Sequence, residues 1–245
     1  MGVFAQIAEE AINNSDIGTA AWAIQICEKS RCMLIFKENL EVPIFMGHSA
    51  KNIIDLLQIW YSNQQNDNEE FWQQTLSDNA FAISQIFSIP ISIIKEKAYV
   101  GGTQVSGEKG KFVDYLLQNT VSGEAAIIEI KTPKKKLLGR KYRNVINVST
   151  ELTGGVLQVS DYKQSLIKRL KDINDEHPEL EAFDPKMILI IGNYSEQIKT
   201  SDQKNSFELF RRSMRHIEII TFDELFKKVE ILAQLFGLKA EKKSS

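Results

Sequence analysis

Cysteine and histidine are scarce in this chain of 245 residues, which has two cysteines and three histidines. Cys27 and Cys32 cannot supply the four ligands of a structural zinc site, and in so long a chain they do not form a disulfide framework. His48, His177 and His216 stand in no spacing typical of a nucleophile's partner or a metal site. The sequence therefore argues against zinc sites and against serine or cysteine nucleophiles, and it favours a reducing, cytoplasmic compartment.

The sequence also lacks long apolar runs, a signal peptide and a nucleotide-binding loop. No apolar stretch reaches the length of a membrane span, and the first ten residues have neither the basic start nor the apolar stretch of a signal peptide. The stretch Gly107–Gly110 lacks the spacing of a loop that binds nucleotide phosphates. We therefore expect no membrane partner and no nucleotide cofactor.

Charge is nearly balanced over the whole chain but not along it. Lysine and arginine number 30 against 32 aspartates and glutamates, so the chain is not a general polycation. The segment Lys131–Arg143 nevertheless holds seven basic residues and no acidic one. Such a segment neutralises phosphates, and the candidate nucleic-acid ligands in it are Lys134, Lys135, Lys136, Arg140, Lys141 and Arg143. The alternative is a flexible, solvated loop without a ligand.

A polar stretch, Ser62–Asn68, divides the chain because it has no apolar residue to bury and favours turns. We predict an N-terminal region at residues 1–68, a main domain at 69–236 and a solvated tail at 237–245. The N-terminal region contains apolar stretches at 22–27 and 33–36 and a helical pattern over Asn52–Trp60. We interpret it as an α+β extension that inhibits or gates the main domain.

The main domain has the pattern of an α/β fold. Apolar spacing predicts one helix over Phe71–Phe87, or two short helices broken near Asp78, and Pro90 ends it. Glycine-rich turns then separate three strands, which we predict to form an antiparallel meander. The three strands of the meander are predicted at 91–100, 112–118 and 125–131. After them helices and strands alternate, with a helix at 156–174, a strand at 187–191, a helix at 207–214, a strand at 217–221 and a helix at 222–236.

Two strands of the predicted meander carry acidic residues in apolar surroundings. Asp114 interrupts the run Phe112–Leu117, and a lone carboxylate in a buried strand is unfavourable unless it is paired or bound to a cation. Glu129 and Lys131 project from one face of their strand because side chains alternate along it. If the strands pair, Asp114 and Glu129 converge and offer the oxygen ligands that Mg²⁺ prefers. Lys131 then holds a phosphate or orients the attacking water.

Each of these residues has an ordinary structural alternative. In most proteins, an acidic and a basic residue two positions apart on one strand face, as Glu129 and Lys131 are, form a surface ion pair. Asp114 is equally suited to a hydrogen-bonded turn or edge position. Gln158 and Tyr162 share a helix face, where they either support a ligand or pack as a satisfied core amide and ring. Glu70 is a further metal carboxylate or, more commonly at such a position, a partner of the helix dipole.

With these elements in this order, the sequence resembles the PD-(D/E)xK nuclease superfamily through Asp114 and Glu129-Ile130-Lys131. It resembles the Shedu antiphage defence proteins more closely. The stretches that carry this resemblance lie between residues 69 and 222, and they are Phe71–Gln73, Gly101–Gly102, Val113–Leu117, Ile128–Pro133, Tyr142–Arg143, Glu151–Val156 and Gln158–Tyr162. The proline that names the superfamily is absent before Asp114, as is common among its members.

The resemblance implies a Mg²⁺-dependent DNA endonuclease of a bacterial defence system, acting as a homo-oligomer on DNA and accepting Mn²⁺ as a substitute. It implies Asp114 and Glu129 as metal ligands, Lys131 at the reaction centre and Gln158 in a supporting role. The implied fold is a restriction-endonuclease-like core. The residues leave a second reading open, a non-catalytic nucleic-acid binder or scaffold that uses the basic segment and needs neither Glu129 nor a metal.

Overall fold

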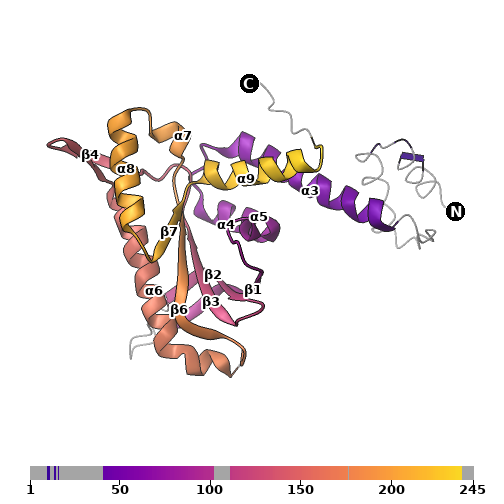
Figure 1. The fold of residues 1–245 in the computed structure, drawn as a ribbon, viewed down its shortest axis with the longest axis horizontal. Coiled ribbons are helices and arrows are strands. Elements are labelled where there is room, and N and C mark those ends of the chain that lie inside the picture. Colours follow the sequence, from indigo (N-terminus) through magenta and orange to yellow (C-terminus); the bar gives the residue numbers. More distant parts are fainter. Residues whose placement is uncertain are drawn as a thin grey trace. The chain divides into compact units, whose positions relative to one another are not determined.

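The computed structural model describes residues 41–101, 111–175 and 177–238, with four isolated residues nearer the N-terminus. The chain separates into two compact units, one formed by residues 1–62 and 229–245 and the other by Asn63–Lys228 (Figure 1). The predicted N-terminal stretches at 22–27 and 33–36, and most of the predicted tail, lie outside the described residues. None of the described helices is long and apolar enough to cross a membrane.

The first unit is described mainly through helix α3 (Glu41–Asn63) and the second half of helix α9 (Phe222–Leu235). α3 contains the predicted helix over 52–60 and extends it at both ends. The apolar residues that predict this helix are buried, among them Leu56 and Trp60. The Tyr61 hydroxyl donates to Glu230 Oε1 over 2.8 Å, and burial together with that carboxylate raises the pKa of Tyr61 to about 12.

The second unit is a mixed five-stranded sheet with helices on both faces, so the α/β prediction is confirmed. The strands run in the order β1-β2-β3-β6-β7, where β1 to β3 form the predicted antiparallel meander and β6 and β7 run parallel to β3. The bounds are α4 Glu69–Ser77, α5 Ala80–Ser84, β1 Ile91–Gly101, β2 Lys111–Asn119, β3 Glu124–Ile130, β4 Leu138–Tyr142, β5 Val145–Val148, α6 Thr150–Asn174, β6 Glu181–Ile190, α7 Tyr194–Gln197, α8 Ser201–Ser213 and β7 Ile217–Ile220.

Capping residues explain why two helices begin earlier than the apolar spacing predicts. α6 starts at Thr150 because the Ser149 side chain accepts from the backbone N–H of Leu152. α8 starts at Ser201 because Thr200 and Gln203 form a reciprocal capping box. The helix predicted over 71–87 is two helices, α4 and α5, separated at Asp78 and Asn79. The sequence analysis missed α7 and the β4–β5 hairpin.

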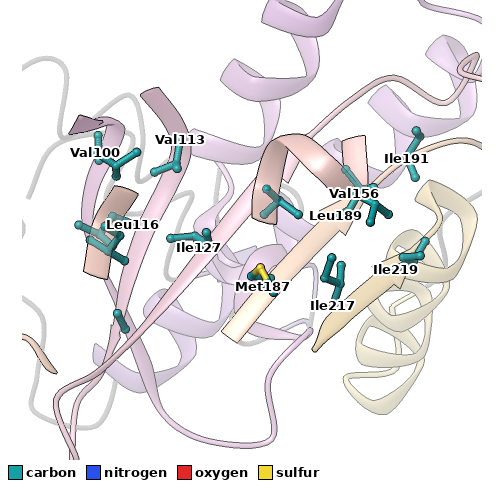
Figure 2. Close-up of a cluster of buried hydrophobic side chains, with 14 of the residues drawn as sticks. Val100, Val113, Leu116, Ile127, Val156, Met187, Leu189, Ile191, Ile217 and Ile219 are labelled. Carbon is teal, nitrogen blue, oxygen red and sulfur yellow. The ribbon is translucent and has the colours of Figure 1, made fainter. Parts of the chain in front are cut away.

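The core lies on both faces of the sheet. α6 covers one face, where Val156 packs with Leu189 and Ile127 in one buried cluster (Figure 2). Val159 of the same helix belongs to this cluster. On the other face, Trp72 of α4 is fully buried and meets aromatic rings from the start of α9 in edge-to-face contacts. The central strand β3 is buried from Ala125 to Ile130, so any charged residue within it is held away from water.

Candidate active site

Backbone hydrogen bonds tie together the carboxyl ends of the three parallel strands. The N–H of Lys131 donates to Ile190 over 2.8 Å, and the N–H of Gly192 donates to Thr132 over 3.0 Å. Gly192 has φ 71°, and a Cβ there would lie 2.6 Å from the Leu137 side chain, so only glycine fits. The backbone after β3 is therefore fixed, and with it the position of Lys131.

Asp114 and Glu129 lie across from each other on neighbouring strands. β2 and β3 pair with Tyr115 opposite Ile128, and one further residue along this antiparallel register brings Asp114 opposite Glu129. Directly opposite residues point to the same face of a sheet. The period-two pattern of β3 adds Lys131 to that face. The structure thus brings together the three residues that the sequence analysis singled out.

Glu129 is an acidic side chain in the buried part of β3, with 3% of its surface exposed. Its Oε1 accepts from Lys131 Nζ over 2.6 Å. Its Oε2 is buried and has no hydrogen-bond partner among the described residues. Burial, followed by the charge of Asp114, raises the pKa of Glu129 above its usual value, and Lys131 opposes this without reversing it.

Both oxygens of Asp114 accept hydrogen bonds. Gln73 Nε2 donates to Oδ1 and the backbone N–H of Ile130 donates to Oδ2, each over 2.6 Å. Burial raises the pKa of Asp114, while the Ile130 N–H and Lys131 act in the opposite direction. These bonds hold the carboxylate in one orientation, and each oxygen keeps a second lone pair for another ligand.

Lys131 links Glu129 to the start of α4. Its Nζ lies 3.3 Å from Glu69 Oε1 as well as 2.6 Å from Glu129. Burial alone would lower the pKa of Lys131, but the two carboxylates outweigh it and raise the pKa, so the side chain is an ammonium. The acid that reaches the site from α4 is therefore Glu69. Glu70, the acid considered from the sequence, is exposed and lines the pocket beside Asp114.

Helix α4 is held against the site at both its start and its middle. The Asn68 side chain caps the helix by accepting from the N–H of Phe71. The Tyr115 hydroxyl donates to the carbonyl of Gln73 over 2.9 Å, next to Asp114, which accepts from the same residue's side chain. An open pocket of about 850 Å³ lies along α4 and β2 and reaches Asp114. Asp114 is therefore accessible from that side, whereas Glu129 and Lys131 do not line this pocket.

Gln158 and Tyr162 are bonded to each other on α6. Gln158 Nε2 donates to the Tyr162 hydroxyl over 2.7 Å. Burial raises the pKa of Tyr162, and the charges of Glu129 and Lys131 act on it too, so α6 presents this pair towards the site. No bond joins Gln158 to Asp114, Glu129 or Lys131 in the described part of the chain.

Hydrogen bonds from α7 hold the first part of the basic segment after Lys131. Gln197 of α7 donates to the carbonyls of Pro133 and Lys135 and accepts from the N–H of Leu137 over 2.8 Å. Lys134 Nζ reaches the Gln65 side chain over 3.2 Å. Lys136 is exposed, and the remaining basic residues, Arg140, Lys141 and Arg143, belong to the β4–β5 hairpin.

The acidic loop before α4 completes this side of the site. The hydroxyl of Thr132, which is fully buried, donates to Asp67 Oδ1, and Lys135 Nζ lies 3.4 Å from the same oxygen. The hydrogen bond from Thr132 lowers the pKa of Asp67. Lys135 is therefore neutralised within the fold, and it is a weaker candidate for phosphate contact than its exposed neighbours.

The donor set fits a divalent cation through two carboxylates. In residues 41–101, 111–175 and 177–238, no three side chains of histidine, cysteine, aspartate or glutamate are grouped closely enough to hold a metal ion. The antiparallel register nevertheless puts Asp114 and Glu129 on one face of the sheet, where the charge of Asp114 acts on Glu129. Among the described residues, the Oε2 of Glu129 lacks the contact that a buried carboxylate requires. Two carboxylates with water in the remaining positions match the way Mg²⁺ is usually bound.

Glu69, Gln73, Asp67 and Thr132 are the residues of this site that the sequence analysis did not single out. They come from the polar stretch, from the start of α4 and from the residue after Lys131. Gln73 had a signal, because it belongs to one of the stretches that carry the family resemblance. Thr132 had the same signal, since it lies in the stretch Ile128–Pro133, whereas Glu69 and Asp67 had none that distinguishes them from helix-capping and surface residues.

Comparison with known proteins agrees with the resemblance seen in the sequence. Residues 66–226 match the family model described as Shedu protein SduA, C-terminal, which is more than half of the chain. The chain is also 37% identical over 193 residues to the Shedu protein SduA of Bacillus cereus (strain B4264). This match covers 75% of the chain and 50% of the relative, so the chain spans about half the length of the relative. The chain belongs to the Shedu SduA family.

Proposed function

We propose that the Asn63–Lys228 unit is a metal-dependent DNA endonuclease of PD-(D/E)xK type, which serves in bacterial antiphage defence. The observation that carries the proposal is the pair Asp114 and Glu129, opposite on β2 and β3 with Lys131 on the same face, in which one buried oxygen of Glu129 has no partner among the described residues. Membership of the Shedu SduA family supports it. A purely structural carboxylate has its oxygens satisfied, so this arrangement favours a ligand.

Asp114 and Glu129 are the residues that would hold Mg²⁺ or Mn²⁺. Gln73 and the Ile130 N–H keep Asp114 oriented, which reduces the rearrangement needed when a ligand arrives. When bound, the cation supplies a bound water of lowered pKa and neutralises negative charge on the phosphodiester.

Lys131 serves the phosphate. Its side chain is 15% exposed, and its ammonium is bonded to Glu129 Oε1 and lies close to Glu69. A cation held on the same face as the carboxylates stabilises charge that develops on a phosphoryl oxygen or orients the attacking water. We assign the Gln158–Tyr162 pair to support of this face of the site, because the Tyr162 hydroxyl is fixed by Gln158.

A second candidate function is a non-catalytic DNA binder that retains the fold. The observations that favour it are that both oxygens of Asp114 already accept hydrogen bonds and that the described residues contain no group of three metal-ligating side chains. Binding would then depend on the exposed basic residues and would need no divalent cation.

The test is cleavage of linear and circular DNA with Mg²⁺, with Mn²⁺ and with EDTA. Wild-type protein is compared with Lys131→Ala and with Lys168→Ala, a matched control on the exposed side of α6. We expect metal-dependent cleavage by the wild type and the control and none by Lys131→Ala. Metal-independent binding of DNA by all three proteins, without cleavage under any condition, would favour the binder.

The family resemblance also supports a homo-oligomer that acts in the cytoplasm. Light scattering of the full chain at several concentrations measures the oligomer, and a mass of 27.9 kDa at every concentration contradicts it.

A further inference from the structure

The basic segment that follows Lys131 separates into two parts with different surroundings. Lys134 and Lys135 turn towards Gln65 and Asp67, close to the carboxylate site. The second part is a hairpin, β4 and β5, which reaches out past α8 (Figure 1). The contacts of Lys134 and Lys135 do not account for the hairpin.

The hairpin is a narrow two-stranded ribbon. Tyr142 pairs with Val145, so the turn consists of Arg143 and Asn144 alone. Arg143 has φ 53°, the left-handed conformation that two-residue hairpin turns require at their first position. All residues of β4 beyond Leu138 are exposed.

The base of the hairpin is firmly held. Leu137, the residue before β4, is fully buried, and its carbonyl accepts from the N–H of Ser149 over 3.1 Å. The N–H of Ile146 in β5 donates to Ser206 Oγ of α8 over 2.9 Å. The edge of β5 is therefore covered by α8, and β4 is the outer strand. The hairpin therefore has an anchored base and an exposed tip.

The chemistry of the hairpin is that of a polyanion ligand. Arg140, Lys141 and Arg143 are exposed, and residues 138–148 contain no acidic side chain. None of the three cations has an ion-pair partner in the described part of the chain. The ring of Tyr142 is 56% exposed, and the guanidinium of Arg143 lies 5.4 Å from its centre. The arginine thus covers one face of the ring, which leaves less of it for stacking with an unpaired base.

We propose that the β4–β5 hairpin is an arm that enters the major groove of double-stranded DNA, an inference that rests on the proposed nuclease function and names its substrate as duplex DNA. The major groove, about 12 Å wide, admits a two-stranded β-ribbon in undeformed DNA, whereas the minor groove, at about 6 Å, takes one only when the duplex is bent or widened. Arg140 and Lys141 on the outer strand then contact phosphates, while the Tyr142–Arg143 tip lies against base edges. Single-stranded DNA offers no groove for such an arm.

The test uses full-length protein and a charge-removing double variant, Arg140→Gln with Lys141→Gln. The matched control is Lys168→Gln with Lys171→Gln, which removes two exposed charges from α6. Binding to a 30-base-pair duplex and to one of its strands is measured in EDTA, so that cleavage does not interfere. We expect the hairpin variant to bind the duplex about tenfold more weakly, and its salt slope to fall by about 1.8 for two lost phosphate contacts.

Groove-specific competitors place the arm. Methyl green, which occupies the major groove, should displace the wild-type protein from the duplex, and netropsin, which occupies the minor groove, should not. Displacement by netropsin alone, or an unchanged duplex affinity and salt slope in the hairpin variant, overturns the proposal. An equal loss of single-strand and duplex binding also overturns it, because the arm would then be a general phosphate contact.

A small phosphodiester separates this inference from the proposed function. Hydrolysis of bis(p-nitrophenyl) phosphate with Mn²⁺ reports on Asp114 and Glu129 without needing the arm. We expect the hairpin variant to keep this hydrolysis while losing duplex affinity. A wild-type protein that hydrolyses the diester but does not bind duplex overturns the arm alone, whereas absence of diester hydrolysis counts against the nuclease itself. The single variant Lys141→Gln repeats the binding test. We expect its unfolding midpoint to match that of the wild type and its salt slope to change by half as much as that of the double variant.

Discussion

Asp223 and Glu129 are two carboxylates of the same unit, and their oxygens differ in their hydrogen-bond partners. Asp223, in the first turn of α9, accepts from the backbone N–H groups of Tyr194 and Ser195 and from the Ser195 hydroxyl, over 2.6 to 2.8 Å. Glu129 has one ammonium partner and one buried oxygen without a partner among the described residues. Both oxygens of Asp223 therefore have hydrogen-bond donors within the fold, whereas one oxygen of Glu129 has none among the described residues.

The pKa shifts of the two carboxylates follow from this difference. Burial by itself acts to raise the pKa of Asp223, but the Ser195 and Thr221 hydroxyls and the backbone N–H groups outweigh it and lower the pKa. Burial raises the pKa of Glu129, and the charge of Asp114 adds to it. Hydrogen bonds that outweigh burial and lower the pKa show that the fold itself stabilises the charge of Asp223. A buried carboxylate whose negative charge the surrounding groups do not fully stabilise is a candidate for function.

The largest expected effect is on cleavage. Glu129→Gln and Lys131→Ala should each reduce the rate of metal-dependent DNA cleavage by about 10³-fold or more, because each removes a group at the reacting phosphate. Asp223→Asn should leave the rate within about threefold of the wild type, because Asp223 serves the fold alone. Single-turnover cleavage of plasmid DNA measures all three. A comparable loss in Asp223→Asn would remove the distinction between the two carboxylates.

For the free energy of unfolding we expect the reverse order, with the larger loss on substitution of Asp223. Asp223→Ala leaves three donors at α7 without their acceptor, and we expect the free energy of unfolding to fall by about 2 kcal/mol at pH 7. Because the folded pKa of Asp223 is lowered, its contribution is present above the unfolded pKa and is lost as pH falls through the folded pKa. Urea unfolding at pH 7 and at pH 3 should therefore show a smaller difference between variant and wild type at pH 3. A difference that does not change with pH would mean that the charge of Asp223 is irrelevant.

Gln73 allows the orientation of Asp114 to be tested on its own. Gln73→Leu removes the donor to Asp114 Oδ1, and we expect cleavage to fall by about tenfold with little change in DNA affinity. Gln74→Leu is the matched control, because its neighbouring amide donates to Asp78 on the exposed side of α4. Equal effects of the two substitutions would mean that α4, and not the bond to Asp114, is responsible.

The smallest expected effect is a gain in stability at Glu129. With EDTA present, Glu129→Gln should raise the free energy of unfolding by about 1 kcal/mol at pH 8, because burial of the Glu129 charge outweighs its attraction to Lys131, which keeps Glu69 as a partner. The folded pKa of Glu129 is raised, so its ionisation opposes folding increasingly as pH rises above the unfolded pKa. The gain should therefore vanish near pH 4. Urea unfolding measures it, and a loss of stability at pH 8 would contradict the account.

Local patterns in the sequence predicted the meander and the convergence of Asp114 with Glu129. The turn signals set the strand order, and the period of two decided which side chains share a face. Gln73 and Glu69 reach the site from positions 41 and 62 residues away from their partners, and no local pattern specifies such contacts. The hairpin was missed because Arg140–Arg143 reads as a charged loop, and its strand pairing depends on anchoring at α8.

The most direct test of the central claim is a calorimetric titration of Mn²⁺ into the full-length protein, with Glu129→Gln and Asp223→Asn as variants. We expect wild type and Asp223→Asn to bind Mn²⁺ alike, and Glu129→Gln to bind it at least about tenfold more weakly. Binding of equal strength in Glu129→Gln would show that the unpartnered carboxylate oxygen is not a metal ligand, and would contradict the assignment of Asp114, Glu129 and Lys131 as a metal-dependent active site.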